Sequence, residues 1–537
     1  MDEPTLPKGY IRGVLARECA FPNGDRVLAM EVHPDCPHRR RRRARRAMLN
    51  HALERLGSWQ HLPAGEGFVM TFSDQGVPRH FPAEEPDPAV IEALADGLRP
   101  TDSGNADRLL VFASERLRFV HAWGKFVVWD EGRWVIDFGS VLATEMATEA
   151  VHRMFRTAID RPPQERDAML KWAKASESKS AIQAMTVLVR GRPGMLVDHE
   201  RFDADPCLLN VRNGTVDLRT GELRPHNPED LLTMQAPVLY DATATAPLWD
   251  ECLRTWQPDP QMRWYLQRMI GSGATGFPVE LLLINHGQGA NGKSKCFGAV
   301  TSTLGPYAVI PHKSLLVATR YEEHQTVVAS LFRKRLLLAA ETEVGASLNE
   351  TQVKNLTGGD RLRARRMRED EWEFNPTWTA FLHTNHRPQV RSSDEGIWRR
   401  LRLVPWEVTI PSDQRDLHLA AKLAKESSGI LNWIIAGAVA WLGGDREEPE
   451  QVEAATKRYR YEEDHIGRFI ADCCVVDRSL TVLAAALGAE YSRWCEANGE
   501  ADLGPRTLGL ALGARGFEQF RPGGQRGWKG LTLKANR

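Results

Sequence analysis

One eight-residue stretch constrains this chain more than any other: Gly-Gln-Gly-Ala-Asn-Gly-Lys-Ser at residues 287–294. It fits the phosphate-binding pattern of a glycine, four free positions and then Gly-Lys-Ser. The apolar run at residues 279–285 predicts a buried strand before it, and residues 295–304 predict a helix after it. A phosphate-binding loop needs this strand–loop–helix context. The alternative, a glycine-rich turn that binds nothing, accounts less well for the Lys-Ser pair and the upstream strand.

The residues of this loop suit a nucleoside triphosphate. Glycines let the backbone curl so that its N–H groups point at phosphate oxygens, and the start of the helix adds partial positive charge. Lys293 would reach the β- and γ-phosphates, and Ser294 would hold Mg²⁺. The predicted ATP-binding residues are Gly287, Gln288, Gly289, Ala290, Asn291, Gly292, Lys293, Ser294 and Lys295.

Length and composition exclude several classes of protein. The 537 residues suffice for about three or four domains. Lysine and arginine together number 70, as do aspartate and glutamate, so only local clusters of charge can indicate a nucleic-acid partner. No segment approaches the roughly 20 apolar residues of a membrane span, and the first residues lack an apolar signal core. The eight cysteines form no Cys-x-x-Cys pair, which argues against a zinc ribbon and a disulfide framework and favours the cytoplasm.

Changes in composition and periodicity predict five regions in a multidomain α/β chain. Near the N-terminus an arginine run at residues 38–46 is either a phosphate-binding arm or a solvated helix face. Turn signals at Asn213-Gly214 and Thr220-Gly221 predict hairpins. A basic, glycine-rich hairpin at residues 521–529 indicates a winged-helix-like module, with a plain helical cap as the alternative. The predicted regions are an N-terminal region of unknown role (1–98), an α+β domain (99–200), a helical and hairpin domain (201–275), an ATPase domain (276–445) and a helical, winged-helix-like domain (446–537).

A second buried strand is predicted at residues 335–340, and an acid follows it directly. Glu341 at such a strand end could polarise the water that attacks the γ-phosphate and contact the metal, with Glu343 as the alternative. Many phosphate-loop ATPases carry a further acid just before that glutamate, but here the position is Ala340. Metal would then be held mainly by Ser294, the phosphates and water. An acid after a strand can also be only a solvated strand end.

Two more polar positions complete the candidate catalytic set. Asn385 follows a third apolar strand at residues 379–384, where its amide could sense the γ-phosphate or align the water, although asparagine is also a common turn former. Arg399 and Arg400 are adjacent, and a guanidinium offered by a neighbouring subunit stabilises the transition state by roughly 10³–10⁵ in rate. An ordinary pair of surface arginines is the alternative.

Arginines cluster between the second and third predicted strands, at residues 361–368, after a Gly358-Gly359 bend. Alternate residues of a strand share one face, so a basic hairpin is expected there, with Trp372 and Phe374 on the returning strand. Such a hairpin suits the phosphate backbone of single-stranded DNA. The alternative is internal ion pairing with the acids at residues 369–371. The predicted DNA contacts are Lys354, Arg361, Arg363, Arg365, Arg366 and Arg368.

Together these motifs resemble the superfamily 3 helicases, specifically the phage/plasmid and poxvirus-type primase-helicases. The similarity covers roughly residues 101–537. It includes the stretch 208–218, which looks like the domain that precedes the ATPase in that family. The matching motifs lie at residues 287–294, 341–343, 354–363, 384–388 and 398–406.

The resemblance implies a modified AAA+ phosphate-loop ATPase with helical flanking domains, assembled as a homo-hexameric ring with the nucleotide between subunits. Lys293 and Ser294 would bind ATP and Mg²⁺, and Glu341 would activate water. Asn385 would be the sensor, and Arg399 or Arg400 the finger acting in trans. The hairpin at residues 358–368 would line the channel and move along DNA.

The implied function is an ATP-dependent DNA helicase of a phage, plasmid or integrated mobile element, in the cytoplasm of a bacterial host or a virus-infected cell. Its partners would be single-stranded or forked DNA, further copies of itself, and a separate primase with other replication factors. Residues 1–98 are too short for a full primase, so no primase activity is expected. Two alternatives stay open: a phosphate-loop phosphotransferase, and a nucleotide-gated DNA-binding initiator or defence protein that does not unwind.

Overall fold

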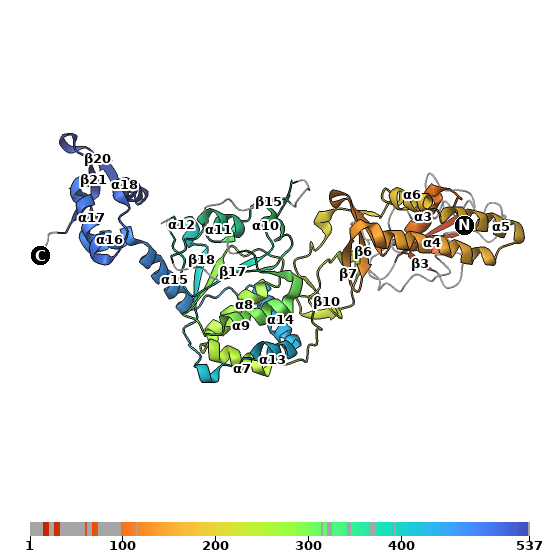
Figure 1. Cartoon of the computed structure of the whole chain (residues 1–537), viewed down its shortest axis with the longest axis horizontal. Coiled ribbons are helices and arrows are strands. Elements are labelled where there is room, and N and C mark those ends of the chain that lie inside the picture. Colours follow the sequence, from red (N-terminus) through yellow and green to blue (C-terminus); the bar gives the residue numbers. More distant parts are fainter. Residues whose placement is uncertain are drawn as a thin grey trace. The chain divides into compact units, whose positions relative to one another are not determined.

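The computed structural model describes most of the chain from Leu98 to Lys534, and it divides that chain into two compact units (Figure 1). The arginine run at residues 38–46 lies outside the described residues. The described ranges are 98–113, 115–312, 315–318, 325–340, 345–365, 371–390 and 394–534, together with a sheet of order β1-β2-β4-β3 formed by β1 (Val14–Ala20), β2 (Arg26–Val32), β3 (Trp59–His61) and β4 (Gly67–Phe72).

The first unit combines a sheet of order β7-β6-β5-β8 with helices that share its buried core. Residues of β5 and β6, such as Leu117 and Phe126, are fully buried against Leu109, Val151 and Met185 of the helices. The strands are β5 (Leu117–Val120), β6 (Lys125–Asp130), β7 (Arg133–Asp137) and β8 (Leu196–Val197), and the helices are α3 (Asp102–Ala113), α4 (Val141–Ile159), α5 (Pro163–Ser176) and α6 (Lys179–Val189).

The expected hairpins follow along the chain. Strands β9 (Leu208–Val211), β10 (Gly214–Asp217) and β11 (Glu222–Arg224) form a sheet of order β11-β10-β9, and the turns at residues 213–214 and 220–221 join neighbouring strands. Two helices follow this sheet along the chain, α7 (Pro247–Trp256) and α8 (Pro260–Ser272).

A five-stranded parallel sheet of order β13-β14-β17-β12-β18 forms the centre of the second unit. Because β17 and β18 both pair with β12 in parallel, the loops after these three strands start at one edge, where His286 is in register with Thr384 and Pro405. The predicted strands at residues 279–285, 335–340 and 379–384 are therefore confirmed. The strands are β12 (Leu282–His286), β13 (Ala308–Val309), β14 (Leu336–Ala340), β17 (Thr379–Thr384) and β18 (Leu401–Pro405).

Helices cover both faces of this sheet (Figure 1). On one face, side chains of α11 (Glu350–Thr357), α12 (Glu395–Trp398) and α15 (Glu450–Glu463) share a buried core with alternate residues of the strands. On the other face, Phe297 of α9 (Lys293–Leu304) packs against Phe381 of β17 with ring centroids 5.1 Å apart. Further helices are α10 (Gln325–Ala329), α13 (Leu419–Lys425) and α14 (Ser427–Leu442).

The C-terminal residues have a core of their own, which includes Phe469, Tyr491, Leu512 and Trp528. Helices followed by a closing hairpin were expected here, and the third strand of the sheet, β19, was missed. The sheet order is β19-β21-β20. The elements are α16 (His465–Cys473), β19 (Cys474–Leu483), α17 (Ala484–Asn498), α18 (Gly504–Ala514), β20 (Glu518–Phe520) and β21 (Gly527–Leu533). Across the ranges that the structure describes, no helix combines the length and apolar character that crossing a membrane requires.

Candidate functional site

The loop between β12 and α9 is the P-loop, residues 287–292. Its glycines occupy positions where a side chain would be strained or would clash. Gly289 and Gly292 have φ of +97° and +87°, in the left-handed region that favours glycine. A Cβ added to Gly292 would lie 2.3 Å from the indole of Trp256, and one added to Gly287 would lie 2.1 Å from the carbonyl oxygen of Trp406. Sterics and backbone conformation therefore both fix the glycines of the motif.

Lys293 is the first residue of α9, and its side chain is only 4% exposed. Its ammonium donates to the carbonyl oxygen of Gly287 at 2.8 Å and to Oδ1 of Asn385 at 3.4 Å. The structure thus brings the P-loop and the asparagine after β17 into contact. A buried cation at a helix N-terminus, beside a loop of backbone N–H groups, is chemically suited to an anion such as phosphate.

The remaining predicted contacts of the loop differ in exposure. Asn291 is buried, whereas Gln288, Ala290, Ser294 and Lys295 are exposed. Within the described ranges no group of three or more His, Cys, Asp or Glu side chains could hold a metal. The exposed hydroxyl of Ser294 in the first turn of α9 nevertheless fits Mg²⁺, which takes few protein oxygens when phosphates and water complete its shell.

Two histidines lie next to this cation. Burial, assisted by the charge of Lys293, lowers the pKa of His383 to about 3. Burial is also the main cause of the lowered pKa of His286, and the charges of Arg387 and Lys293 act in the same direction. Both imidazoles are therefore neutral at pH 7 and add no positive charge beside Lys293.

Glu341 and Glu343, the candidates for catalytic acid and metal contact, lie outside the described residues, as do Arg366 and Arg368. The strand that precedes the two glutamates is described. β14 ends at Ala340, which is in register with His383 of β17. β14 therefore ends at the same edge of the sheet as the strands that carry the P-loop and Asn385.

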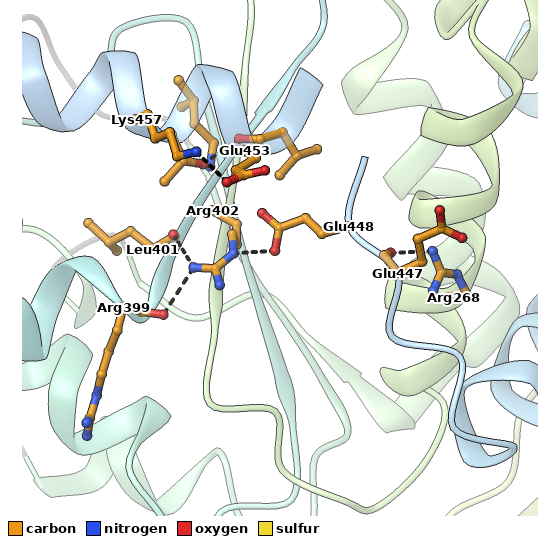
Figure 2. A network of polar contacts seen from close by, with 11 residues as sticks. Arg268, Arg399, Leu401, Arg402, Glu447, Glu448, Glu453 and Lys457 are labelled. Carbon is orange, nitrogen blue, oxygen red and sulfur yellow. Dashed lines mark hydrogen bonds and ion pairs between the residues drawn. The ribbon is translucent and has the colours of Figure 1, made fainter. Parts of the chain in front are cut away.

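Arg399 and Arg400 have different surroundings, which the sequence could not distinguish. The side chain of Arg400 is half-buried and donates to the carbonyl oxygen of Gly396 at 2.7 Å. Arg399 is exposed; only its carbonyl joins the network around Arg402, at 3.1 Å, and its side chain extends away from that network (Figure 2). Of the pair, Arg399 has the position that a finger reaching another molecule requires.

Lys354, predicted to contact DNA, lies on α11 and forms an ion pair with Asp394. The hydrogen bond from Lys354 is the main cause of the lowered pKa of that carboxyl. Asp394 also caps α12 by accepting from the backbone N–H of Gly396 at 2.9 Å. Lys354 thus supports the short helix before Arg399, and it is not part of the arginine face of the hairpin.

The predicted basic hairpin is formed by β15 (Leu362–Arg365) and β16 (Glu371–Phe374), which pair in antiparallel fashion. The arginines at 361, 363 and 365 are all exposed and alternate with the buried Leu362 and Ala364, which confirms the shared face. Phe374 is buried, and Trp372 packs beside it against Phe332.

Acids on β16 partly offset the charge of this face. Arg363 donates to Glu373 at 3.0 Å, and Arg365 is in register with Glu371. The internal ion pairing considered above is thus present in part, through a glutamate that the sequence interpretation did not name. An exposed pair such as this contributes only about 0.2–1 kcal/mol, so a phosphate can replace the carboxylate at small cost.

Two tryptophans contact the P-loop: Trp256, which the sequence did not indicate, and Trp406, which ends the 398–406 motif but had no predicted role. Trp256 ends α7 and packs on Gly292, and Trp406 follows β18 and hydrogen-bonds around Gly287. The available signal was the alternation of Leu401 and Leu403 before Trp406, which has the period of a strand.

Replacing Gly292 with alanine is expected to abolish nucleotide binding. The new Cβ would meet the Trp256 indole at 2.3 Å, at a φ of +87° that costs a side chain about 1–3 kcal/mol. The matched control is Gly298→Ala on the same helix, where nothing lies within 4 Å of the added Cβ. Titration with a fluorescent ADP analogue measures both. Equal binding by the two variants would contradict this account of the loop.

Two parts of the chain match models of known protein families. Residues 106–258 match the family model described as D5 N terminal like, and residues 285–400 match a family of unknown function, DUF5906. The apo structure of the NrS-1 C-terminal region is similar over 78% of this chain and 96% of that one, with a TM-score of 0.42 and 9% identity.

Viral proteins are among the relatives. A candidate helicase of Acanthamoeba polyphaga mimivirus is 28% identical over 213 residues, 38% of this chain and 22% of that protein. A candidate helicase of Invertebrate iridescent virus 6 is 24% identical over 261 residues, 46% and 27% of the two chains. A candidate primase of African swine fever virus is 22% identical over 341 residues, 56% and 34%. This chain thus spans between a fifth and two-fifths of the length of these relatives. The D5 N-terminal-like match and the viral relatives support similarity to a D5-like primase-helicase family.

Proposed function

We propose that this chain is an ATP-dependent DNA helicase of superfamily 3 that works as a homo-hexameric ring on single-stranded or forked DNA. It would serve the replication of a phage, plasmid or integrated mobile element in the cytoplasm of the host or infected cell. One observation carries the proposal: the ammonium of Lys293 lies between the Gly287 carbonyl and the Asn385 amide at one edge of a parallel sheet.

The roles of the residues follow from this edge. The P-loop N–H groups and Lys293 bind the phosphates of ATP, and Ser294 holds Mg²⁺, which neutralises phosphate charge when bound. Asn385 orients the attacking water or senses the γ-phosphate, in contact with the same ammonium. Glu341 takes the proton of that water, with Glu343 as the alternative. Residues of a modified AAA+ core would thus perform hydrolysis without a second acid at position 340.

A homo-hexameric ring is proposed because the candidate arginine finger has a side chain that is exposed at the surface of its own chain. Arg399 is exposed and extends away from its own network, so it is suited to stabilising charge at the site of a neighbouring subunit (Figure 2). The C-terminal module, with helices before a hairpin and its own core, is proposed to be winged-helix-like.

The exposed arginines of the β15–β16 hairpin are proposed to grip the DNA backbone, and removing two of them should uncouple hydrolysis from unwinding. In Arg363→Ala/Arg365→Ala, unwinding of forked DNA should collapse while DNA-independent ATPase persists. The salt dependence of single-strand binding, log K against log salt, should lose a slope of about 1.4, from roughly 0.7 for each of two phosphate contacts.

The control for the hairpin variant removes two exposed arginines elsewhere, Arg156→Ala and Arg219→Ala. These should leave the salt slope and the unwinding rate unchanged. Unwinding by the hairpin variant at the wild-type rate would remove the hairpin from the mechanism.

Primase activity is not part of the proposal. African swine fever virus relatives are named as primases, but their match covers about a third of those proteins. Primer synthesis by this protein on a single-stranded template, from ribonucleotides or deoxynucleotides, is the assay that decides the point.

A further inference from the structure

Trp406, a residue outside the phosphate-binding motif, holds the P-loop in place. Trp406 is 1% exposed and directly follows β18. Its backbone N–H donates to the carbonyl oxygen of His286 at 2.7 Å, and its indole N–H donates to Oδ1 of Asn285 at 3.0 Å. Its carbonyl oxygen accepts from the side-chain amide of Asn291 at 3.2 Å. One residue therefore bonds to the strand before the loop and to the loop itself.

The segment after Trp406 continues across the loop. The backbone N–H of Ile410 donates to the carbonyl oxygen of Ala290 at 2.7 Å, so residues 406–410 hold the loop at two points. The fit leaves no space, because a Cβ at Gly287 would lie 2.1 Å from the Trp406 carbonyl oxygen and 2.4 Å from the Asn291 amide nitrogen. A change in the conformation of the loop would therefore displace Trp406, and a shift of Trp406 would disturb the loop.

The other end of the loop, at Gly292, is contacted by a second tryptophan. Trp256 of α7 packs against Gly292. The next residue, Gln257, is buried and donates to the carbonyl oxygen of Pro405, the last residue of β18, at 2.9 Å. The two tryptophans hold opposite ends of the loop, and Gln257 ties α7 to the strand that carries Trp406.

We propose that Trp406 is a positioning residue, which keeps the P-loop closed around the space where phosphates bind by hydrogen-bonding Asn285, His286 and Asn291. It does not contact the reacting atoms. This inference rests on the proposed nucleotide-binding function. Losing its indole hydrogen bond should therefore weaken binding of any nucleotide with a β-phosphate, while the chemical step changes little.

The test compares two buried tryptophans in the full-length protein. Trp406→Phe removes the bond to Asn285, and Trp378→Phe removes an equally buried indole bond, 3.0 Å to the carbonyl oxygen of Leu356, away from the loop. We expect Trp406→Phe to raise the Kd for ADP by roughly five- to tenfold. KM for ATP should rise likewise, with kcat changed less than about twofold, because uniform binding is lost. Trp378→Phe should match the wild type in Kd at a similar loss of thermal stability.

A second variant separates the hydrogen bond from ring packing. Asn285→Ala should weaken ADP binding as Trp406→Phe does, and the double variant should add nothing, because both changes remove one bond. The inference about Trp406 would be wrong, and the proposed function unaffected, if Trp406→Phe bound ADP as tightly as the wild type. The same holds if Trp378→Phe weakened ADP binding as much as Trp406→Phe. A wild-type protein that binds no ADP would overturn the proposed function and this inference together.

Discussion

Replacing Lys293 with alanine is expected to lower ATP hydrolysis by a factor of about 10²–10³ or more and to abolish unwinding. The lysine is buried, and its ammonium lies between the P-loop carbonyl and Asn385, where the loop would bring the phosphates of ATP. Its two histidine neighbours are neutral at pH 7 and supply no charge in its place. A steady-state ATPase assay measures the loss.

The control is Lys457→Ala, which removes an exposed lysine paired with Glu453 on α15 in the same unit. That change should leave hydrolysis within about twofold of the wild type, because an exposed pair contributes little. If the Lys293→Ala protein hydrolysed ATP at the control rate, the P-loop would not be the catalytic site.

Replacing Arg399 with alanine is expected to lower ATP hydrolysis by roughly 10³–10⁵ while leaving nucleotide affinity nearly unchanged. The reason is its position: it is exposed, and Figure 2 shows its side chain directed away from the Arg402–Glu448 pair. A residue that acts only on a neighbour's transition state contributes nothing to binding at its own site. Hydrolysis and ADP binding should be measured on the same preparation.

Arg400→Ala provides the comparison that assigns the finger. This side chain donates to the Gly396 carbonyl within its own chain, so its removal should reduce thermal stability and affect hydrolysis far less than removal of Arg399. The reverse ranking in hydrolysis would assign the finger to Arg400 and contradict the interpretation of their surroundings.

The sequence predicted those parts of the site that local pattern determines. The strand β12, the P-loop and the strand β17 were placed within a few residues, because a buried parallel strand is an apolar run and the loop has a fixed spacing. The alternation of the hairpin arginines was likewise a local property. Parallel topology then brought Lys293 and Asn385 together, 92 residues apart.

Contacts set by tertiary structure could not be predicted. Nothing near Lys354 in the sequence indicated that it pairs with Asp394, 40 residues away. The pairing of Arg363 with Glu373 depends on the exact register of the hairpin. Trp406 contacts the P-loop only because β18 pairs with β12, although they are the last and the first strand of this sheet along the chain. The contacts of Lys354, Arg363 and Trp406 are evident only from the tertiary structure.

The most direct test of the account mixes two inactive proteins, Lys293→Ala and Arg399→Ala, in the presence of forked DNA. Each variant alone should be inactive. Mixed rings bring an intact P-loop of one subunit next to an intact finger of another, so ATP hydrolysis should recover to a sizeable fraction of the wild-type rate. No recovery on mixing, together with a wild-type protein that hydrolyses ATP as a monomer, would contradict the claim that neighbouring copies share each site.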